Sequence, residues 1–453
     1  MMYKMQYGNT LCSINDDPAY LMRIAMQQIG FQREKIIASK FLFKKPDERP
    51  KIVPSVAYVI RQMKRPEEVK LLRKVYGKQF ILISAYGSEE HRRARLTDRI
   101  RDSLEISTKA EDIAFKTEKA LARDQDEGAD ESGQHLRATY HLADVFVDGI
   151  NKDQMRVGLD RFFAAFFGKN DIGPSKVEYG MYAAKAASLR STDLSRQVGS
   201  AIFNFDGDLI SQGCNEVPRA FGGTYWADEE PDYRDVKLGY DPNDHLKKGV
   251  IRDLMERLSK AGFLSEEHKK FDDFKKLVDF LIGRDATKKR EPNFACLKNS
   301  QVNDLTEYGR VVHAEMVAIC DAARLGKPIK NTNLYVTTFP CHNCTKHIIA
   351  SGIRSVIFME PYPKSRAKQL HKDEIEIEKA SENKVAFLPF LGISPYRYRD
   401  IFEKKSRKTD GKANDWYSEV GPRPMLSISA PAYLTIEPLE VTKLGGSIQK
   451  KLI

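Results

Sequence analysis

The feature that most constrains this chain is a pair of short motifs holding one histidine, one glutamate and two cysteines. Val312-His-Ala-Glu315 is followed by Phe339-Pro-Cys-His-Asn-Cys344, which puts Cys341 28 residues after His313. One imidazole and two thiolates fill three corners of a tetrahedral Zn²⁺ site and leave the fourth open to water, as in catalytic zinc sites. The spacing therefore predicts a Zn²⁺ centre with His313, Cys341 and Cys344 as ligands.

The residues around these ligands suit the same chemistry. Cys341 and Cys344 are three residues apart at a predicted helix start, where the positive end of the helix favours thiolates. Glu315, two residues after His313, can take a proton from the attacking water and pass it to a ring nitrogen and a leaving amine. The pattern H-x-E followed by P-C-x-x-C is the zinc deaminase signature, in which the glutamate shuttles protons and binds no metal.

Other interpretations of the cysteines are weaker. A lone C-x-x-C also occurs in redox pairs and as half of a zinc knuckle. The chain has no second C-x-x-C, and a redox pair does not require His-Ala-Glu upstream. Six cysteines in 453 residues do not make a disulfide framework either.

Composition predicts a soluble protein with packed cores. Apolar residues make up 41% of the chain and aromatic residues 10%. The mean hydropathy is −0.49, and no apolar run approaches the roughly 18 residues of a membrane span. The start, Met1–Lys4, has no apolar core followed by a cleavage site, so we expect no signal peptide, a cytoplasmic location and no membrane partner.

The chain is also basic. Lysine and arginine number 74 against 63 acidic residues, which gives a formal net charge of +11. The excess is spread along the chain among many acids. It favours a polyanionic partner, whether nucleotide, DNA or RNA, without choosing among them.

The N-terminal 150 residues are predicted to form an α/β domain. Strand-like and helical patterns alternate there, an order that favours a parallel sheet. The last of these helices carries five arginines, which suit either a solvated face paired with glutamates or a phosphate-facing lid. The alternating segments are 55–60, 65–76, 79–86 and 88–104.

Beyond this domain the sequence predicts a connector and a larger α/β domain. Strands are expected at 197–204, 209–214, 333–338, 355–360 and 384–389. A helix predicted at 364–379 separates the last two strands, and a crossover of that length suits parallel strands. Residues 425–441 suggest short strand-like pieces. The predicted division is 1–150, connector 151–175, domain 176–400 with an insertion at 219–308, and C-terminal extension 401–453.

Residues 177–390 resemble the cytidine deaminase superfold and, within it, the deoxycytidylate deaminases. The resemblance rests on Gln197-Val-Gly-Ser-Ala-Ile-Phe203, on Gly213-Cys-Asn215 and on the zinc motif. It implies an α/β/α domain around a mixed five-stranded sheet. The parallel last strands are typical of the branch that acts on deoxycytidylate, tRNA adenosine and nucleic acids.

The same resemblance implies a set of substrate contacts. Asn215 would hydrogen-bond the deoxyribose 3′-hydroxyl, although asparagine at a strand end is also common in turns. Phe339 and Tyr362 are candidate walls for the base, although such aromatics often belong only to the core, and Ala314 is a further candidate contact. The candidate phosphate contacts, which also suit a solvated surface, are Arg196, Lys364 and Arg366.

A closer resemblance covers nearly the whole chain. A kinase-like α/β segment, an enlarged insertion before Val-His-Ala-Glu, and Phe387-Leu-Pro-Phe-Leu-Gly392 resemble the bacterial antiviral (anti-phage) deoxycytidylate deaminases. That family implies hydrolytic deamination of dCTP and dCMP, which drains the nucleotide pool that a phage needs. It also implies activity held in check until infection, in some members by a small inhibitory RNA. Deoxycytidylate deaminases are often hexamers, so we expect a homo-oligomer.

The kinase-like segment departs from that family. No G-x-x-x-x-G-K-[ST] P-loop occurs in the chain, and Gly168-Lys-Asn170 lacks both the spaced glycine and the hydroxyl. Either the chain starts after that motif or nucleotide binding has been lost there. We therefore expect an incomplete, regulatory kinase-like domain without ATP or GTP hydrolysis.

Two other functions stay open. A cytosine or adenine deaminase acting on single-stranded DNA or RNA would suit the basic balance and the long insertion. The sequence shows no aromatic-plus-basic stripe for a single strand, however. A non-catalytic regulator built on a deaminase frame is disfavoured because the complete zinc motif and Glu315 are present.

Overall fold

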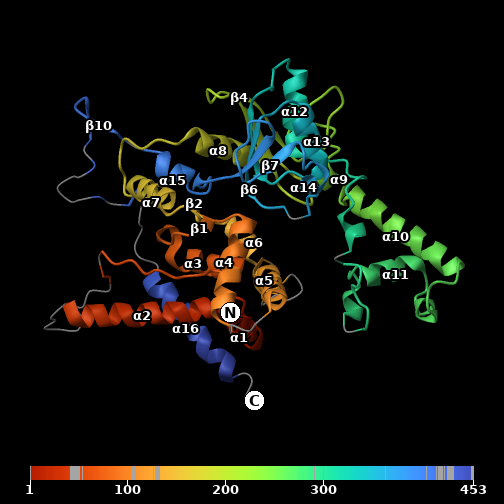
Figure 1. Ribbon diagram of the computed structural model, residues 1–453, viewed down its shortest axis with the longest axis horizontal. Coiled ribbons are helices and arrows are strands. Elements are labelled where there is room, and N and C mark those ends of the chain that lie inside the picture. Colours follow the sequence, from red (N-terminus) through yellow and green to blue (C-terminus); the bar gives the residue numbers. More distant parts are fainter. Residues whose placement is uncertain are drawn as a thin grey trace. The chain divides into compact units, whose positions relative to one another are not determined.

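The computed structural model describes residues 2–40, 52–53, 55–104, 109–125, 127, 133–289, 291–298, 300–362, 364–404, 406–414, 416, 422, 424–425 and 433–449. Internal contacts divide the chain into two compact units (Figure 1). The first unit combines Met1–Glu178 with Phe390–Ile453, and the second is Tyr179–Pro389. None of the described helices is both long enough and apolar enough to cross a membrane.

The second unit is built on a mixed six-stranded sheet with the order β4-β3-β5-β6-β8-β7. Strand β3 pairs antiparallel with β4 and β5, and all pairs from β5 to β7 are parallel. The mixed sheet and the parallel pairing of β6 with β8 confirm the prediction. The strands are β3 Gly199–Phe203, β4 Leu209–Cys214, β5 Asn333–Thr338, β6 Ser355–Glu360, β7 Ile375–Ile377 and β8 Val385–Pro389.

The predicted number of five strands is wrong, because the sixth strand comes from a segment predicted as helix. The helix expected at 364–379 is reduced to α14, Ala367–Leu370, and β7 follows it. Ile375 and Ile377 flank Glu376 with the two-residue period of a strand, and both are β-branched. Ile375 is buried beside β8, with which β7 pairs.

Two helices cover opposite faces of this sheet at very short distances. A Cβ at Gly199 would lie 2.0 Å from the Ala184 carbonyl oxygen of α8, Lys176–Ser188. A Cβ at Gly213 would lie 2.3 Å from the Ala314 carbonyl oxygen of α12, Ala314–Arg324. Ser200, which follows Gly199 on β3, donates a hydrogen bond to that same Ala314 oxygen at 2.8 Å. Successive residues of β3 thus face different helices, which gives the α/β/α layers that were predicted.

The α12 face of the sheet holds the core that supports the zinc motif. Helix α13, His342–Ala350, packs there beside α12 (Figure 1). The fully buried residues that meet on this face come from three central strands and both helices: Ile202, Leu334, Val336, Val356, Ala314, Ala318, Cys344 and Ile348. Because this packing is continuous, the starts of α12 and α13 are held close to each other.

The insertion between β4 and α12 is largely helical. The helix predicted near 245–261 is confirmed as α10, while the one predicted at 266–283 is confirmed only as the shorter α11. Helix α10 begins at Pro242, and the Asp241 carboxylate caps it by accepting a hydrogen bond from the Asn243 N–H at 2.9 Å. The elements are α9 Asp235–Leu238, α10 Pro242–Lys260, η3 Glu266–Lys270, α11 Phe274–Leu281, η4 Ala286–Lys288 and η5 Gln301–Asp304.

The first unit contains a three-stranded sheet of order β1-β2-β9. Strands β1 and β2 are parallel, as predicted for this domain, and β9 pairs antiparallel with β2. The strand predicted at 55–60 is wrong, because the structure gives these residues no strand partner. The strands are β1 Ile83–Tyr86, β2 Val145–Asp148 and β9 Gly392–Ile393, and a separate hairpin joins β10 Lys408–Thr409 to β11 Lys412–Ala413.

Helices make up most of the rest of the first unit. Helix α4 carries the five arginines and buries none of its residues. Arg93 pairs with Glu89 at 2.6 Å and Arg101 with Asp98 at 3.0 Å, which favours the solvated face over a phosphate lid. The helices are α1 Met2–Ile14, α2 Tyr20–Lys40, α3 Pro66–Tyr76, α4 Glu89–Asp102, α5 Ala110–Gln125, α6 Leu136–Tyr140, α7 Lys152–Phe166, α15 Tyr398–Phe402 and α16 Tyr433–Gln449.

Residues from both ends of the chain complete this unit. Arg397, 1% exposed, donates from Nε to the fully buried Asp144 carboxylate at 3.0 Å. It also donates to the carbonyl oxygens of Lys78 and Phe80. The division by contacts therefore differs from the predicted one, since residues from 390 onward belong with the N-terminal part. The stretch predicted as a connector, 151–175, contains the 15-residue helix α7, which packs on β2.

Helix α16 replaces the short strands predicted at 425–441, whose described part is helical from residue 433. Its Glu440 carboxylate pairs with Arg23 of α2 and with Lys74 of α3, the latter at 2.8 Å. Its Glu437 accepts a hydrogen bond from the Tyr76 hydroxyl at 2.7 Å. These pairs, whose carboxylates are buried, hold a helix whose sequence, with Pro438 inside it, has low intrinsic helix propensity.

Candidate metal centre and active-site cavity

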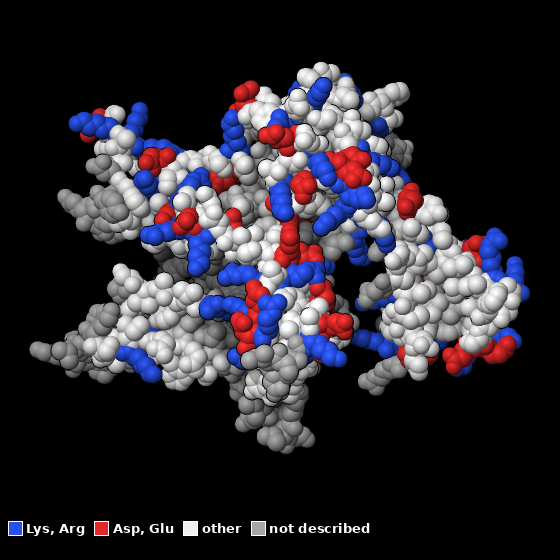
Figure 2. Space-filling view, viewed as in Figure 1, with Lys and Arg blue, Asp and Glu red and all other residues white. Residues whose placement is uncertain are grey.

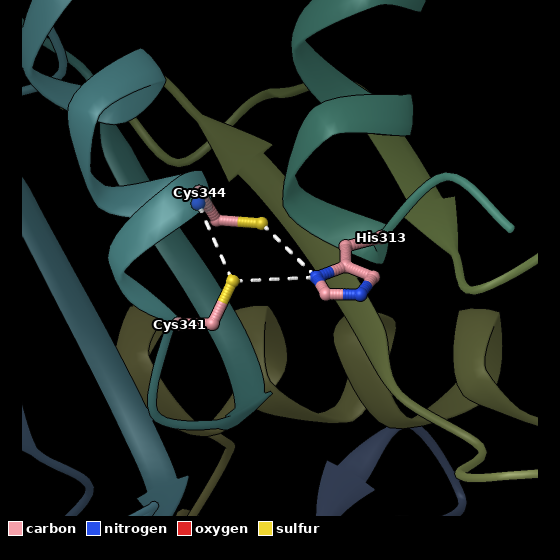
Figure 3. A group of neighbouring side chains, drawn as sticks. All are labelled: His313, Cys341 and Cys344. Atoms are coloured by element: carbon pink, nitrogen blue, oxygen red, sulfur yellow. Dashed lines mark hydrogen bonds between the residues drawn. The ribbon is translucent and has the colours of Figure 1, made fainter. Parts of the chain in front are cut away.

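Three potential metal ligands meet at the starts of α12 and α13. The His313 Nδ1 atom lies 3.4 Å from the Cys341 sulfur and 3.4 Å from the Cys344 sulfur. All three donor atoms lie within 4.8 Å of one another, and Figure 3 shows the side chains pointing toward one shared position. One nitrogen and two sulfurs at this spacing fit the three protein ligands of a catalytic Zn²⁺.

The helix starts explain why these side chains converge. Cys341 is the N-cap of α13, and its sulfur accepts a hydrogen bond from the Cys344 N–H at 3.4 Å. His313 is the N-cap of α12, and its side chain makes no capping hydrogen bond. The predicted placement of both cysteines at a helix start is thereby confirmed, and the imidazole stays available to a metal.

The three donor groups shift one another's pKa values, and Cys341 is the one whose shift favours the deprotonated form. Hydrogen bonds from Cys344 and His313 lower the pKa of the Cys341 thiol to about 4, despite its burial. The hydrogen bond to Cys341 raises the pKa of His313 to about 9. The hydrogen bond with Cys341, together with burial, raises the pKa of Cys344 well above its usual value. Metal binding would displace the remaining protons, because zinc ligands bind in their deprotonated forms.

Glu315 lies next to the three ligands in the first turn of α12. Its side chain is 3% exposed and lines the same cavity as His313 and Cys341. Burial raises the pKa of the Glu315 carboxyl to about 7. A carboxyl with such a pKa can both accept and donate a proton near neutral pH.

Asn215 connects the end of β4 to the start of α12. Its Oδ1 atom accepts a hydrogen bond from the Ala314 N–H at 2.9 Å, at the helix start that His313 leaves uncapped. Its Nδ2 atom donates to the Asp193 carboxylate at 3.0 Å and to the Arg196 carbonyl oxygen at 3.1 Å. Asn215 lines the cavity, whereas Ala314 is fully buried and does not.

The other predicted contacts surround the same cavity, of about 1270 Å³ within the second unit. Phe339 lines it and also packs on Phe358 and Phe387 in the core, with ring centres 4.9 and 5.4 Å apart. Tyr362 lines it too, and the Arg196 guanidinium lies 5.6 Å from the centre of the Tyr362 ring. The remaining predicted contacts, Lys364 and Arg366, are exposed residues that also line it.

Several cavity residues were not predicted from the sequence. Asp193 precedes β3, while Asp235 and Asp241 belong to the insertion, and all three line the cavity. Arg310, just before the zinc motif, pairs with Asp235 at 3.0 Å. The Asp241-Pro242 pair signals a helix start in the sequence, but no sequence pattern indicates that this helix start faces the zinc motif.

Comparison with known proteins agrees with the geometry of this site. Residues 174–360 match the family model described as "Cytidine and deoxycytidylate deaminase zinc-binding region". A cytidine and deoxycytidylate deaminase zinc-binding domain is present. Zn²⁺ is therefore the cofactor of this domain, and the His/Cys/Cys group supplies suitable ligands.

Individual relatives cover shorter stretches. The chain is 29% identical over 121 residues to "ComE operon protein 2" of Bacillus subtilis (strain 168), covering 24% of this chain and 64% of that protein. It is 44% identical over 54 residues to the human "Deoxycytidylate deaminase", covering 12% of this chain and 29% of that protein. The chain thus spans less than two thirds of the length of either relative.

Solved structures show only a distant likeness. The crystal structure of dCMP deaminase from the cyanophage S-TIM5 in complex with dCMP and dUMP matches with 15% identity and a TM-score of 0.25. That match covers 48% of this chain and 98% of the other.

Proposed function

We propose that this protein catalyses the zinc-dependent hydrolytic deamination of deoxycytidine nucleotides, dCMP or dCTP, to deoxyuridine nucleotides. The observation that carries the proposal is the buried Glu315 carboxyl beside three converging metal donors, on the wall of a nucleotide-sized cavity. Similarity to deoxycytidylate deaminases supports the choice of base.

The proposed roles follow from position. His313, Cys341 and Cys344 would hold Zn²⁺, which when bound would supply a nucleophilic water at neutral pH by lowering the pKa of that water. Glu315 accepts a proton from the attacking water on a carboxylate oxygen and delivers it to N3 of cytosine. The water oxygen bonds to C4, and Glu315 then moves the remaining proton of that oxygen to the exocyclic amine, so that the C4–N4 bond breaks, ammonia leaves and the oxygen remains on C4 of uracil.

The cavity offers complementary groups for the rest of a nucleotide. Phe339 and Tyr362 are aromatic walls against which a pyrimidine can pack. Arg196, Lys364 and Arg366 present cations to a phosphate. We assign the sugar 3′-hydroxyl to the neighbourhood of Asn215, whose Oδ1 keeps one lone pair beyond its bond to the Ala314 N–H.

A free nucleotide is a better candidate than a nucleic acid strand. Figure 2 shows lysines and arginines interspersed with aspartates and glutamates over the displayed face. A groove for single strands usually combines a continuous basic track with stacking aromatics. Over its described residues, the displayed face carries no such continuous basic track, which supports a small anionic substrate, and a strand remains the alternative that the experiment tests.

The test is to incubate zinc-loaded full-length protein separately with dCMP, dCTP, CTP and cytosine-containing single-stranded DNA. Product is followed by chromatography. Uracil product from dCMP or dCTP alone is the expected result, and comparison of the two settles the preferred phosphate number. Product from DNA alone would favour the editing function, and no product from any of the four would contradict the proposal.

We further propose that this activity drains the deoxycytidine nucleotide pool in anti-phage defence. The resemblance to antiviral deoxycytidylate deaminases supports this role, with a kinase-like regulatory N-terminal region, a homo-oligomer such as a hexamer, and a small inhibitory RNA. Expression in phage-challenged bacteria should lower dCTP and raise deoxyuridine nucleotides only after infection. Unchanged pools in cells that carry the active enzyme would contradict the role.

A further inference from the structure

The cavity that holds the zinc motif has two walls of opposite charge. We call the cationic side the basic rim; it consists of Arg196, Lys364, Arg366 and Lys368. We call the anionic side the acidic wall; it consists of Asp193, Asp235, Asp241 and Glu307. Two of the acidic residues, Asp235 and Asp241, belong to the helical insertion between β4 and α12.

The sheet topology separates the insertion's part of the acidic wall from most of the basic rim, whereas Asp193 and Arg196 both lie in the loop before β3. Strands β4, β5 and β6 all run in the same direction, since β3 is antiparallel to both of its neighbours, β4 and β5, and β5 is parallel to β6. Their carboxyl ends therefore share one edge. The insertion leaves this edge after β4 and most of the basic rim leaves it after β6, with Cys341 following β5 between them.

The charge of the acidic wall is only partly neutralised. Asp235 pairs with Arg310 at 3.0 Å. In the described part of the chain, no lysine or arginine forms an ion pair with Asp193, Asp241 or Glu307. Burial raises the pKa of Asp235, and the nearby Asp241 and Asp193 carboxylates raise it further, against the effect of Arg310. These carboxylates therefore lie close enough to act on the same region of the cavity.

Local hydrogen bonds fix the carboxylates in place. Asp193 accepts from the Asn215 amide at 3.0 Å and from the Ser195 N–H at 3.0 Å. Asp241 accepts from the Ser195 hydroxyl at 3.3 Å and from the Asn243 N–H. The loop before β3 thus links the acidic wall to Asn215, the residue assigned to the 3′ side of the sugar.

We infer that the acidic wall is a specificity element that rejects cytosine nucleotides carrying a second phosphate on the 3′ oxygen. The inference rests on the proposed function, because it takes the 5′-phosphate to lie against the basic rim. A free nucleotide then presents only a hydroxyl to the acidic wall. A residue inside a DNA strand, or a 3′,5′-bisphosphate, presents a second phosphate to carboxylates that repel it.

This arrangement selects by repulsion as well as by attraction. Attraction to the basic rim alone would favour any polyanion, including nucleic acid, and would leave the enzyme bound to abundant competitors. Like charges a few ångströms to about 10 Å apart at a partly solvated site reduce binding severalfold each. Two or three unpaired carboxylates are therefore enough to separate free nucleotides from strands.

The test compares deoxycytidine 5′-monophosphate with deoxycytidine 3′,5′-bisphosphate, which differ by one phosphate. Zinc-loaded full-length protein is expected to prefer the monophosphate in kcat/KM by at least about tenfold. The Asp241→Asn/Glu307→Gln variant removes two charges with little change in shape, and Asn still caps α10. It is expected to narrow that preference by at least about threefold.

A matched control removes two charges from the insertion outside the cavity. Asp253→Asn/Glu256→Gln alters exposed carboxylates of α10 that pair with Arg257 and Arg252. It changes the net charge equally and is expected to leave the preference ratio as in the wild type. Raising the salt concentration from about 0.05 M to about 0.5 M should also narrow the wild-type preference, which a steric barrier would not do.

The outcomes separate this inference from the proposed function. If neither compound is deaminated, the four-substrate assay decides the proposed function, and the acidic wall is tested separately by calorimetric binding of both compounds to the same proteins. Weaker binding of the bisphosphate, relieved in the Asp241→Asn/Glu307→Gln variant, supports it. The inference is overturned if the wild type uses or binds the two compounds equally, or if it binds neither. It is also overturned if the variant keeps the wild-type preference.

Discussion

The two units of this protein are organised in contrasting ways. In the second unit, the chemically important residues come from two short motifs at the starts of adjacent helices, α12 and α13. In the first unit, the decisive contacts join residues hundreds of positions apart. Arg397 meets Asp144, and Glu440 meets Arg23. The site of the second unit thus depends on residues close together in the sequence, whereas the first unit depends on ion pairs between residues far apart in the sequence.

This contrast indicates that the stability of the first unit can be changed without changing the metal group of the second unit. The ligands His313, Cys341 and Cys344 rest on the β3–β5–β6 core, which contains no residue from beyond Pro389. The sheet of the first unit, in contrast, includes β9 and depends on the buried Arg397. Damage to long-range pairs should therefore loosen the first unit while the metal group stays assembled.

The largest effect is expected at the local motif. Glu315→Ala should lower kcat by about 10³-fold or more, because the proton acceptor for the attacking water is lost. The zinc content should stay the same, since the three donor atoms are untouched. Product chromatography and metal analysis on the same sample measure both. Turnover close to that of the wild type would remove Glu315 from the proposed role.

Prediction from the sequence succeeded where the signal was local. The zinc motif predicted three donor residues that the structure brings together, and the strands predicted at 333–338 and 355–360 coincide with β5 and β6. Each of these signals lies within a few residues of sequence, where periodicity and residue type suffice.

Prediction from the sequence failed where contacts between distant residues override the local preference for helix or strand. The sequence predicts that the Ile375–Ile377 segment is the end of a helix. It forms a strand because it pairs with β8, a contact that the local pattern does not reveal. Helix α16 contains Pro438, and the ion pairs that hold it lie on α2 and α3. The acidic wall was missed for a related reason, since nothing near Asp241 in the sequence reveals that its helix start faces the zinc motif.

The second largest effect is expected at the buried ion pair between Arg397 and Asp144 in the first unit. Arg397→Met should destabilise this unit by about 3–5 kcal/mol, because it leaves the Asp144 carboxylate buried without its partner. Trp416 lies in this unit and Trp226 in the other. Denaturant unfolding of a Trp226→Phe background, followed by fluorescence, therefore reports on the first unit alone.

The matched control is Arg399→Met, which removes an exposed arginine paired with Glu403. It should change stability by less than about 0.5 kcal/mol. The zinc content of the Arg397→Met protein should persist under conditions where the fluorescence change shows that the first unit has unfolded. Loss of zinc in parallel with the fluorescence change would contradict the independence of the two units.

A pH effect is expected next in size, at the docking of α16. Burial raises the pKa of Glu440, but hydrogen bonds from Lys443, Lys74 and Arg23 outweigh it and hold the pKa at about 2. A depressed carboxyl pKa stabilises the fold above the unfolded value of 4.5, and this is lost as the pH falls toward 2. The contribution is at most about 3 kcal/mol.

Acid titration of the wild type and of Glu440→Gln measures this contribution. The wild-type first unit should lose stability between about pH 4.5 and pH 2 relative to the variant, whose stability should depend less on pH in that window. At pH 7 the variant should be the less stable of the two. Parallel pH curves for the two proteins would show that Glu440 is not the group responsible.

The smallest effect is expected at the close contact between Gly213 of β4 and helix α12 in the second unit. Gly213→Ala places a Cβ about 2.3 Å from the Ala314 carbonyl oxygen, so α12 must move and carry His313 and Glu315 with it. We expect a loss of about 1–3 kcal/mol in stability and a measurable fall in kcat. Gly249→Ala on α10, with open space around it and an ordinary helical backbone, should instead stabilise by about 0.5–1 kcal/mol. If Gly213→Ala left both kcat and stability unchanged, the close contact between β4 and α12 would not be what positions His313 and Glu315. Their positions would then have to follow from the zinc motif alone.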